Sequence, residues 1–106
     1  MAAERLTLAE LNEMIHQPLR LKIMAALWAE RSRGAVEFAR LKKVSGATDG
    51  NLGSHLTVLE KAGYVEIEKD FVGKRPRTRI TVTPAGGKAY RGHVEYLRQV
   101  VEGLDR

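Results

Sequence analysis

The stretch that decides the fold is TDGNLGSHLTVLEKAGYV, residues 48–65. Leu52, Leu56 and Leu59 recur within it at the spacing of one helix face. Thr48 is a suitable N-terminal cap, and Gly63 suits the left-handed backbone that ends many helices. We therefore predict a helix over about residues 48–62, followed by a strand over residues 64–69.

The outer face of this predicted helix is small and polar. It carries Gly50, Asn51, Ser54, Thr57 and Lys61. Short hydrogen-bonding side chains with little negative charge suit a helix that enters a DNA major groove. A plain surface helix is the alternative interpretation. His55 lies between the two faces, where it either packs half-buried or contacts a base or a phosphate.

The segments before residue 48 complete a helix-turn-helix pattern. Residues 38–45 are predicted to form a short helix that Gly46 ends. Residues 35–37 are long enough only for a very short strand. A longer helix over residues 19–30 follows Pro18. Thr7 and Glu10 have the spacing of a capping box, which predicts a first helix from about residue 8 to residue 15.

The segments after residue 63 predict a β-hairpin and a long helix. A second strand starts near Arg77 and ends at Thr83, so residues 70–76 form a long basic tip. Thr83 and Pro84 mark the start of a final helix that runs to about residue 104. Four cations lie on the hairpin and suit phosphate or minor-groove contact: Lys74, Arg75, Arg77 and Arg79. A charged edge hairpin that resists aggregation is the alternative.

Composition narrows the possible functions. The chain has 106 residues, a formal net charge of +5 and no cysteine, which excludes disulfides, thiolate metal sites and cysteine nucleophiles. The longest apolar run is too short to cross a membrane, so we expect no membrane partner and a cytoplasmic, nucleoid-associated protein. Paired carboxylates and phosphate-binding glycine loops are missing from the sequence, so we expect no enzyme activity.

These segments together resemble a compact winged-helix transcriptional regulator, similar to small members of the MarR and ArsR families. The resemblance rests on FARL at 38–41, the stretch at 48–65, FVGKRPRT at 71–78 and TPAG at 83–86. It implies a recognition helix over residues 48–62, a wing over about residues 70–79 and a homodimer built from terminal helices. ArsR-type metal sites need ligand sets that the scattered His16, His55 and His93 do not supply, so we expect no metal and no cofactor.

Apolar residues near both ends of the chain favour the homodimer on physical grounds as well. Residues 1–17 and 84–106 carry more apolar surface than a small domain needs. The candidate interface residues are Leu8, Leu11, Ile15, Tyr96, Val100 and Leu104. Packing of both helices on their own core is the alternative.

The sequence thus predicts one mainly α domain over residues 1–106, with a small antiparallel hairpin and extra N- and C-terminal helices. The expected function is sequence-specific binding of double-stranded DNA by a homodimeric regulator. The candidate DNA-binding residues are Thr48, Asn51, Ser54, His55, Thr57, Lys61, Lys74, Arg75, Arg77 and Arg79, with Lys42 and Lys43 near the phosphates. A protein-interaction module is the alternative, and the sequence identifies no operator or effector ligand.

Overall fold

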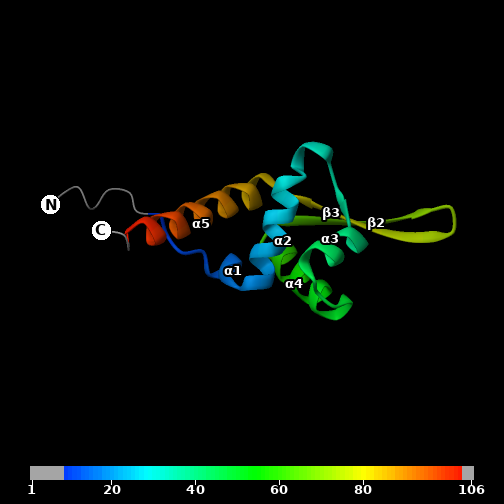
Figure 1. The fold of residues 1–106 in the computed structure, drawn as a ribbon. Helices are drawn as coiled ribbons and strands as arrows, with labels where there is room; N and C mark the ends of the chain where they lie inside the picture. Colours follow the sequence, from blue (N-terminus) through cyan, green and yellow to red (C-terminus); the bar gives the residue numbers. More distant parts are fainter. Residues whose placement is uncertain (1–8, 104–106) are drawn as a thin grey trace.

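A computed structural model describes residues 9–103 of the chain (Figure 1). The elements follow in the order α1 (Glu13–His16), α2 (Pro18–Ala29), the 3-10 turn η2 (Arg31–Arg33), β1 (Val36–Glu37), α3 (Phe38–Ser45), α4 (Asp49–Lys61), β2 (Val65–Val72), β3 (Arg75–Val82) and α5 (Pro84–Gly103). No helix in this part of the chain is both long and apolar enough to cross a membrane.

The three strands form one antiparallel sheet with the order β1-β3-β2. Val36 of β1 lies opposite Ile80 of β3, and Val65 of β2 lies opposite Val82. The β2–β3 hairpin extends beyond the short β1 and projects from the body as a wing (Figure 1). The fold is therefore the expected winged helix-turn-helix, mainly α with a small antiparallel sheet.

One hydrophobic core joins the helices to the base of the sheet. All the helices and strands except α5 contribute buried apolar side chains from one face, and Ala89 and Tyr90 of α5 pack against these side chains partly buried. The core consists of Ile15, Ile23, Met24, Leu27, Val36, Leu41, Leu52, Leu56, Leu59, Val65 and Ile80. This core holds α3 and α4 against the sheet, which fixes α4 relative to the wing.

The expected first helix over residues 8–15 is wrong in its bounds. Residues 9–12 are not helical, and α1 spans only Glu13–His16. Asn12 starts it, because its side-chain oxygen accepts the Ile15 N–H at 3.0 Å. Thr7 of the expected capping box lies outside the described residues.

Two expectations for the hairpin are also wrong. The tip is the two-residue turn Gly73-Lys74 rather than a loop over residues 70–76, and β3 begins at Arg75 rather than near Arg77. Gly73 has a φ of 65°, which lets the chain reverse in two residues. Asp70 and Arg77, expected in or beside a loop, are instead paired residues of the ladder.

Polar contacts fasten the N-terminal segment to α5. The Asn12 N–H donates to His93 Nδ1 at 3.1 Å, and the Ala9 N–H donates to Gln99 Oε1 at 2.8 Å. Because His93 Nδ1 accepts, its Nε2 carries the proton and donates to His16 Nδ1 at 3.3 Å. His93 is fully buried, and burial followed by the nearby His16 lowers its pKa. A neutral His93 is thus built into the contact between α1 and α5.

Candidate nucleic-acid interface

The start of α4 is fixed by a side-chain cap, as the sequence predicts. Thr48 Oγ1 accepts the Asn51 N–H at 3.2 Å, and Asp49 lies in the first turn beside the positive end of the helix. Lys42 of α3 forms an ion pair with Asp49 at 2.8 Å. Gly46, with a φ of 73°, ends α3 and turns the chain toward α4. These contacts set the angle between the two helices.

The outer face of α4 is exposed and carries the expected polar side chains. Leu52, Leu56 and Leu59 are buried, whereas Asn51, Ser54, Thr57 and Lys61 are exposed. The Thr57 hydroxyl donates to Gly53 O at 3.0 Å, and it keeps its lone pairs for an incoming donor. The Asn51 side chain is free to reach outward, because only its backbone N–H serves the cap. The structure thus places these candidates on one accessible surface.

His55 is half-buried at the edge of this surface. Its Nδ1 accepts the Arg20 Nε–H at 3.0 Å, and the same Arg20 donates to Met14 O at 3.0 Å. Desolvation and then the Arg20 charge lower the pKa of His55. His55 is therefore neutral and packed, with Nε2–H as its remaining donor. Arg20 is not among the residues that the sequence predicts for this site. It comes from α2, and its contact with His55 depends on how α2 crosses α4.

The four expected wing cations fall into two groups. Arg77 forms a bidentate ion pair with Asp70: its Nε donates to Oδ1 at 2.9 Å, and its Nη2 donates to Oδ2 at 2.7 Å. Arg79 lies between Glu68 at 3.2 Å and Asp70 at 3.3 Å. The Arg77 hydrogen bond, more than its charge, lowers the pKa of Asp70. Arg77 and Arg79 are thus already neutralised by neighbouring carboxylates.

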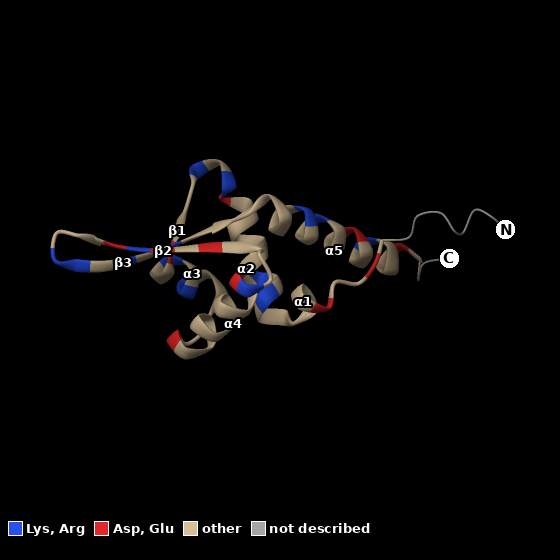
Figure 2. Cartoon of the chain, turned by 180° about the vertical axis from the view of Figure 1, so that it is seen from behind, with Lys and Arg blue, Asp and Glu red and all other residues tan. Residues whose placement is uncertain are grey.

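Lys74 and Arg75 form the second group, at the exposed tip of the wing. Neither forms an ion pair with a described residue, and both are exposed. Figure 2 shows the blue positions at the outer end of the hairpin, beyond the red ones. Phe71 and Val72, exposed by 62% and 54%, share this tip. Lys74 and Arg75 thus place free positive charge at the end of the wing, and Lys69 of β2 is a further exposed cation without an ion pair to a described residue.

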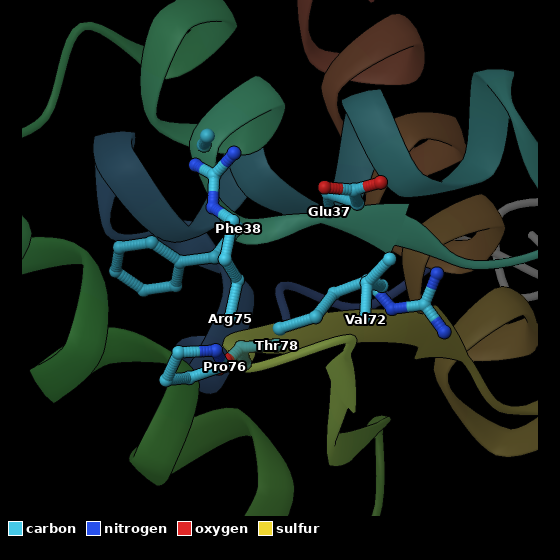
Figure 3. Close-up of a pocket in the computed structure, with 8 residues that line it drawn as sticks. Glu37, Phe38, Val72, Arg75, Pro76 and Thr78 are labelled. Atoms are coloured by element: carbon cyan, nitrogen blue, oxygen red, sulfur yellow. The ribbon is translucent and has the colours of Figure 1, made fainter.

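A groove of about 500 Å³ separates the start of α3 from the wing (Figure 3). Glu37 and Phe38 line it on one side, and Val72, Arg75 and Pro76 line it on the other. The groove lies beyond the end of β1, where the outer edge of β3 has no neighbouring strand. The groove therefore separates the wing from the start of α3.

The residues expected at the dimer interface differ in how far they are buried. Ile15 is fully buried in the core of its own chain, so it leaves no side-chain surface for a second copy to contact. Leu11 and Tyr96 are half-buried, and Tyr96 stacks on His93 with ring centroids 5.9 Å apart. Val100 is 42% exposed on the part of α5 that projects from the body. Leu8 and Leu104 lie outside the described residues.

Histidine and carboxylate side chains are the possible metal ligands of this chain. Among residues 9–103, no group of three or more histidine, aspartate or glutamate side chains is placed to hold a metal ion. His16 and His93 are close to each other, but Nδ1 of His93 already accepts the hydrogen bond of the Asn12 N–H.

The chain is similar to known proteins both in sequence and in structure. The winged helix DNA-binding domain family matches residues 19–101. A transcriptional regulator homologue from Pyrococcus horikoshii has a similar structure, with a TM-score of 0.80, 35% identity, and coverage of 90% of this chain and 91% of that one. An uncharacterized protein of Methanocaldococcus jannaschii is 31% identical over 88% of this chain and 98% of its own length. NadR in complex with 4-hydroxyphenylacetate shares the fold, with a TM-score of 0.64, 24% identity, and coverage of 87% and 65%.

Proposed function

The chain belongs to the winged helix DNA-binding domain family, and from this premise we propose that it is a homodimeric transcriptional regulator that binds specific sequences in double-stranded DNA. The observation that carries the proposal is the exposed polar face of α4 beside a wing with free cations at its tip. The similarity to a transcriptional regulator homologue at 35% identity supports it.

In the proposed complex, α4 lies in the major groove and reads bases. Asn51 has the donor and acceptor needed to bind adenine through two hydrogen bonds. Ser54 and Thr57 follow along the same exposed face and supply shorter hydrogen-bonding groups. Lys61, at the end of the helix, contacts the phosphate backbone. Thr48 acts mainly as the cap that sets the entry angle, and the Nε2–H of His55 reaches a phosphate or a base edge.

The wing contacts DNA beside the major-groove site. Lys74 and Arg75 contribute most of the charge, because neither is paired with a carboxylate among the described residues. Arg77 and Arg79 hold the hairpin rigid through Asp70 and Glu68 and add weaker contacts. Lys43 is exposed near the start of α4, whereas Lys42 is partly neutralised by Asp49.

The homodimer forms through the terminal segments. Val100 and Val101, exposed by 42% and 63%, give the projecting part of α5 an apolar surface that a second copy can cover. Leu11 and Tyr96 border that surface, and the contacts from residues 9–16 to α5 hold the N-terminal segment beside it. Two recognition helices would then read half-sites about one helical turn apart.

A mobility-shift titration against salt concentration tests this function. We expect the logarithm of the affinity to fall steeply with the logarithm of the salt concentration, because several phosphate contacts release counterions. Lys74→Ala/Arg75→Ala should reduce that slope by roughly four, because each substitution is present in both protomers of the homodimer. Arg98→Ala is the matched control, because Arg98 is paired with Glu95 and Glu102 on α5. Absence of binding, or an affinity indifferent to salt, would favour a protein-interaction module instead.

A further inference from the structure

Two guanidinium groups gather at the face of one indole, away from the recognition helix. Trp28 is near the end of α2, and the Arg31 guanidinium carbon of η2 lies 3.8 Å from the centroid of its ring. The guanidinium carbon of Arg91, from α5, lies 5.0 Å from the same centroid. Three elements thus bring two cations to one aromatic side chain.

Backbone carbonyls orient both arginines. Arg31 donates to Trp28 O at 2.6 Å, and Arg91 Nε donates to Gly87 O at 3.1 Å. Gly87 brings α5 against the indole, since a Cβ there would lie 2.6 Å from the Trp28 ring. Each guanidinium therefore keeps further N–H donors in a fixed direction, and little side-chain freedom remains to be lost when an anion binds.

Arg31 and Arg91, like Arg75 at the wing tip, have no carboxylate partner among the described residues. Within residues 9–103, ion pairs engage Arg40, Arg77, Arg79 and Arg98, and none engages Arg31, Arg33 or Arg91. The neighbouring carboxylates are occupied, because Glu30 pairs with Arg40 and Glu95 pairs with Arg98. Arg31 and Arg91 are both exposed. An anion that contacts both guanidinium groups would balance their charge.

We infer that Arg31 and Arg91, both over the ring of Trp28, form a second anion site that binds a phosphate group. Two guanidinium forks favour a multiply charged phosphate over a single carboxylate. The site goes beyond the proposed recognition of DNA by α4 and the wing, because η2 and α5 lie on the other side of α2 from α4 (Figures 1 and 2). A small phosphorylated molecule and a nucleic-acid backbone both present this chemistry.

Tryptophan fluorescence can report on this site alone, because Trp28 is the single tryptophan of the chain. The full chain is titrated with pyrophosphate, with sodium chloride at matched ionic strength as the reference. We expect a saturable change in Trp28 emission with pyrophosphate. The Arg31→Gln/Arg91→Gln variant should bind at least tenfold more weakly. The control Arg98→Gln, on the same helix, should bind like the unmodified chain, and circular dichroism checks that each variant is folded.

A second arm separates the two sources of phosphate. If a 20-base-pair duplex changes Trp28 emission, and the double variant loses that change, the site takes a nucleic-acid backbone. If pyrophosphate saturates the signal and the duplex leaves it unchanged, the site takes a small phosphorylated molecule. A response to pyrophosphate that only matches chloride, or that is the same in the double variant, overturns the inference. The pyrophosphate result stands apart from the mobility shift, so failure of the proposed function is seen separately.

Discussion

Single side chains decide whether the N-terminal segment stays attached to α5. His93 is fully buried and accepts the Asn12 N–H through Nδ1. Protonation of His93 would turn that acceptor into a donor facing another donor. Burial and the neighbouring His16 lower the pKa of His93, and burial and Arg20 lower that of His55. Both histidines therefore resist protonation in the folded chain.

This resistance predicts that the folded state loses stability in mild acid. Above the ordinary histidine pKa of 6.5, both states are neutral and the contact is intact. As the pH falls below 6.5, these histidines become protonated in the unfolded chain while they stay neutral in the folded chain. The free energy of unfolding then falls, by at most about 1.4 kcal/mol per pH unit for each histidine.

Urea denaturation between pH 7.5 and pH 5 measures this dependence. His93→Asn keeps an acceptor near the position of Nδ1 and cannot titrate, so its stability should change less with pH than that of the unmodified chain. Equal pH dependence in the two proteins would show that His93 does not titrate in this way.

The wing arginines predict unequal effects on DNA binding. Arg77 is already paired with Asp70, whereas Arg75 has no carboxylate partner among the described residues. Arg75→Ala should lower the salt slope of DNA binding by about two for the homodimer, one for each protomer, and Arg77→Ala should lower it by less. Fluorescence anisotropy of a labelled duplex at several salt concentrations measures both slopes. A larger effect for Arg77→Ala would mean that its pair with Asp70 opens on DNA.

At the level of elements, close packing between the start of α5 and the start of β2 supports the sheet. The Thr83 hydroxyl caps α5 by accepting the Gly86 N–H at 2.9 Å. A Cβ on Gly86 would lie 2.1 Å from Tyr64 O, a backbone atom that also accepts the Thr83 N–H. The helix can approach this closely only because residue 86 has no side chain.

Two glycine substitutions on α5 should therefore have opposite effects. Gly86→Ala must push α5 away from β2 and should cost about 3 kcal/mol of unfolding free energy. Gly92→Ala meets nothing within 4 Å and should stabilise the chain by about 0.5 to 1 kcal/mol, because alanine favours a helix interior. Urea unfolding curves compare the two variants. A neutral Gly86→Ala would contradict the close approach.

Local signals in the sequence were sufficient for most elements. Pro18, Gly46, Thr48, Gly63 and Thr83 each mark an end of a helix by chemistry that acts within a few residues. The first helix was predicted with wrong bounds, because the spacing of Thr7 and Glu10 pointed to a different cap. The cap that forms is local, from the Asn12 side chain to the Ile15 N–H. The Asn12 N–H also contacts His93, which is 81 positions away and which no local spacing reveals.

The candidate site shows the same limit. The polar face of α4 follows from helical periodicity, and the structure places Asn51, Ser54 and Thr57 there. The neutralisation of Arg77 and Arg79 depends on which residues of β2 and β3 lie opposite each other. A predicted loop over residues 70–76 contains no such pairing. Arg20 beside His55 depends on how two helices cross. In each case the missing information was a contact between distant segments.

On the scale of the whole molecule, the wing and the second half of α5 project from opposite ends of the body (Figure 1). This places the proposed dimer surface away from the wing tip. Val100→Lys should therefore produce a monomer without unfolding it, because the side chain is already 42% exposed. Val44→Lys is a matched control, since Val44 is an exposed valine on α3. Sedimentation equilibrium measures the mass, and an unchanged dimer in Val100→Lys would argue against this interface.

Selection of bound duplexes from a random DNA pool tests the central claim most directly. The account predicts enrichment of an inverted repeat whose half-site centres are about 10 base pairs apart. Asn51→Ala, a variant in which the α4 cap formed by the Asn51 backbone is retained, should lose preference at one position in each half-site while still binding DNA. A pool that shows no enriched sequence, or the same consensus with Asn51→Ala, would contradict sequence reading by α4.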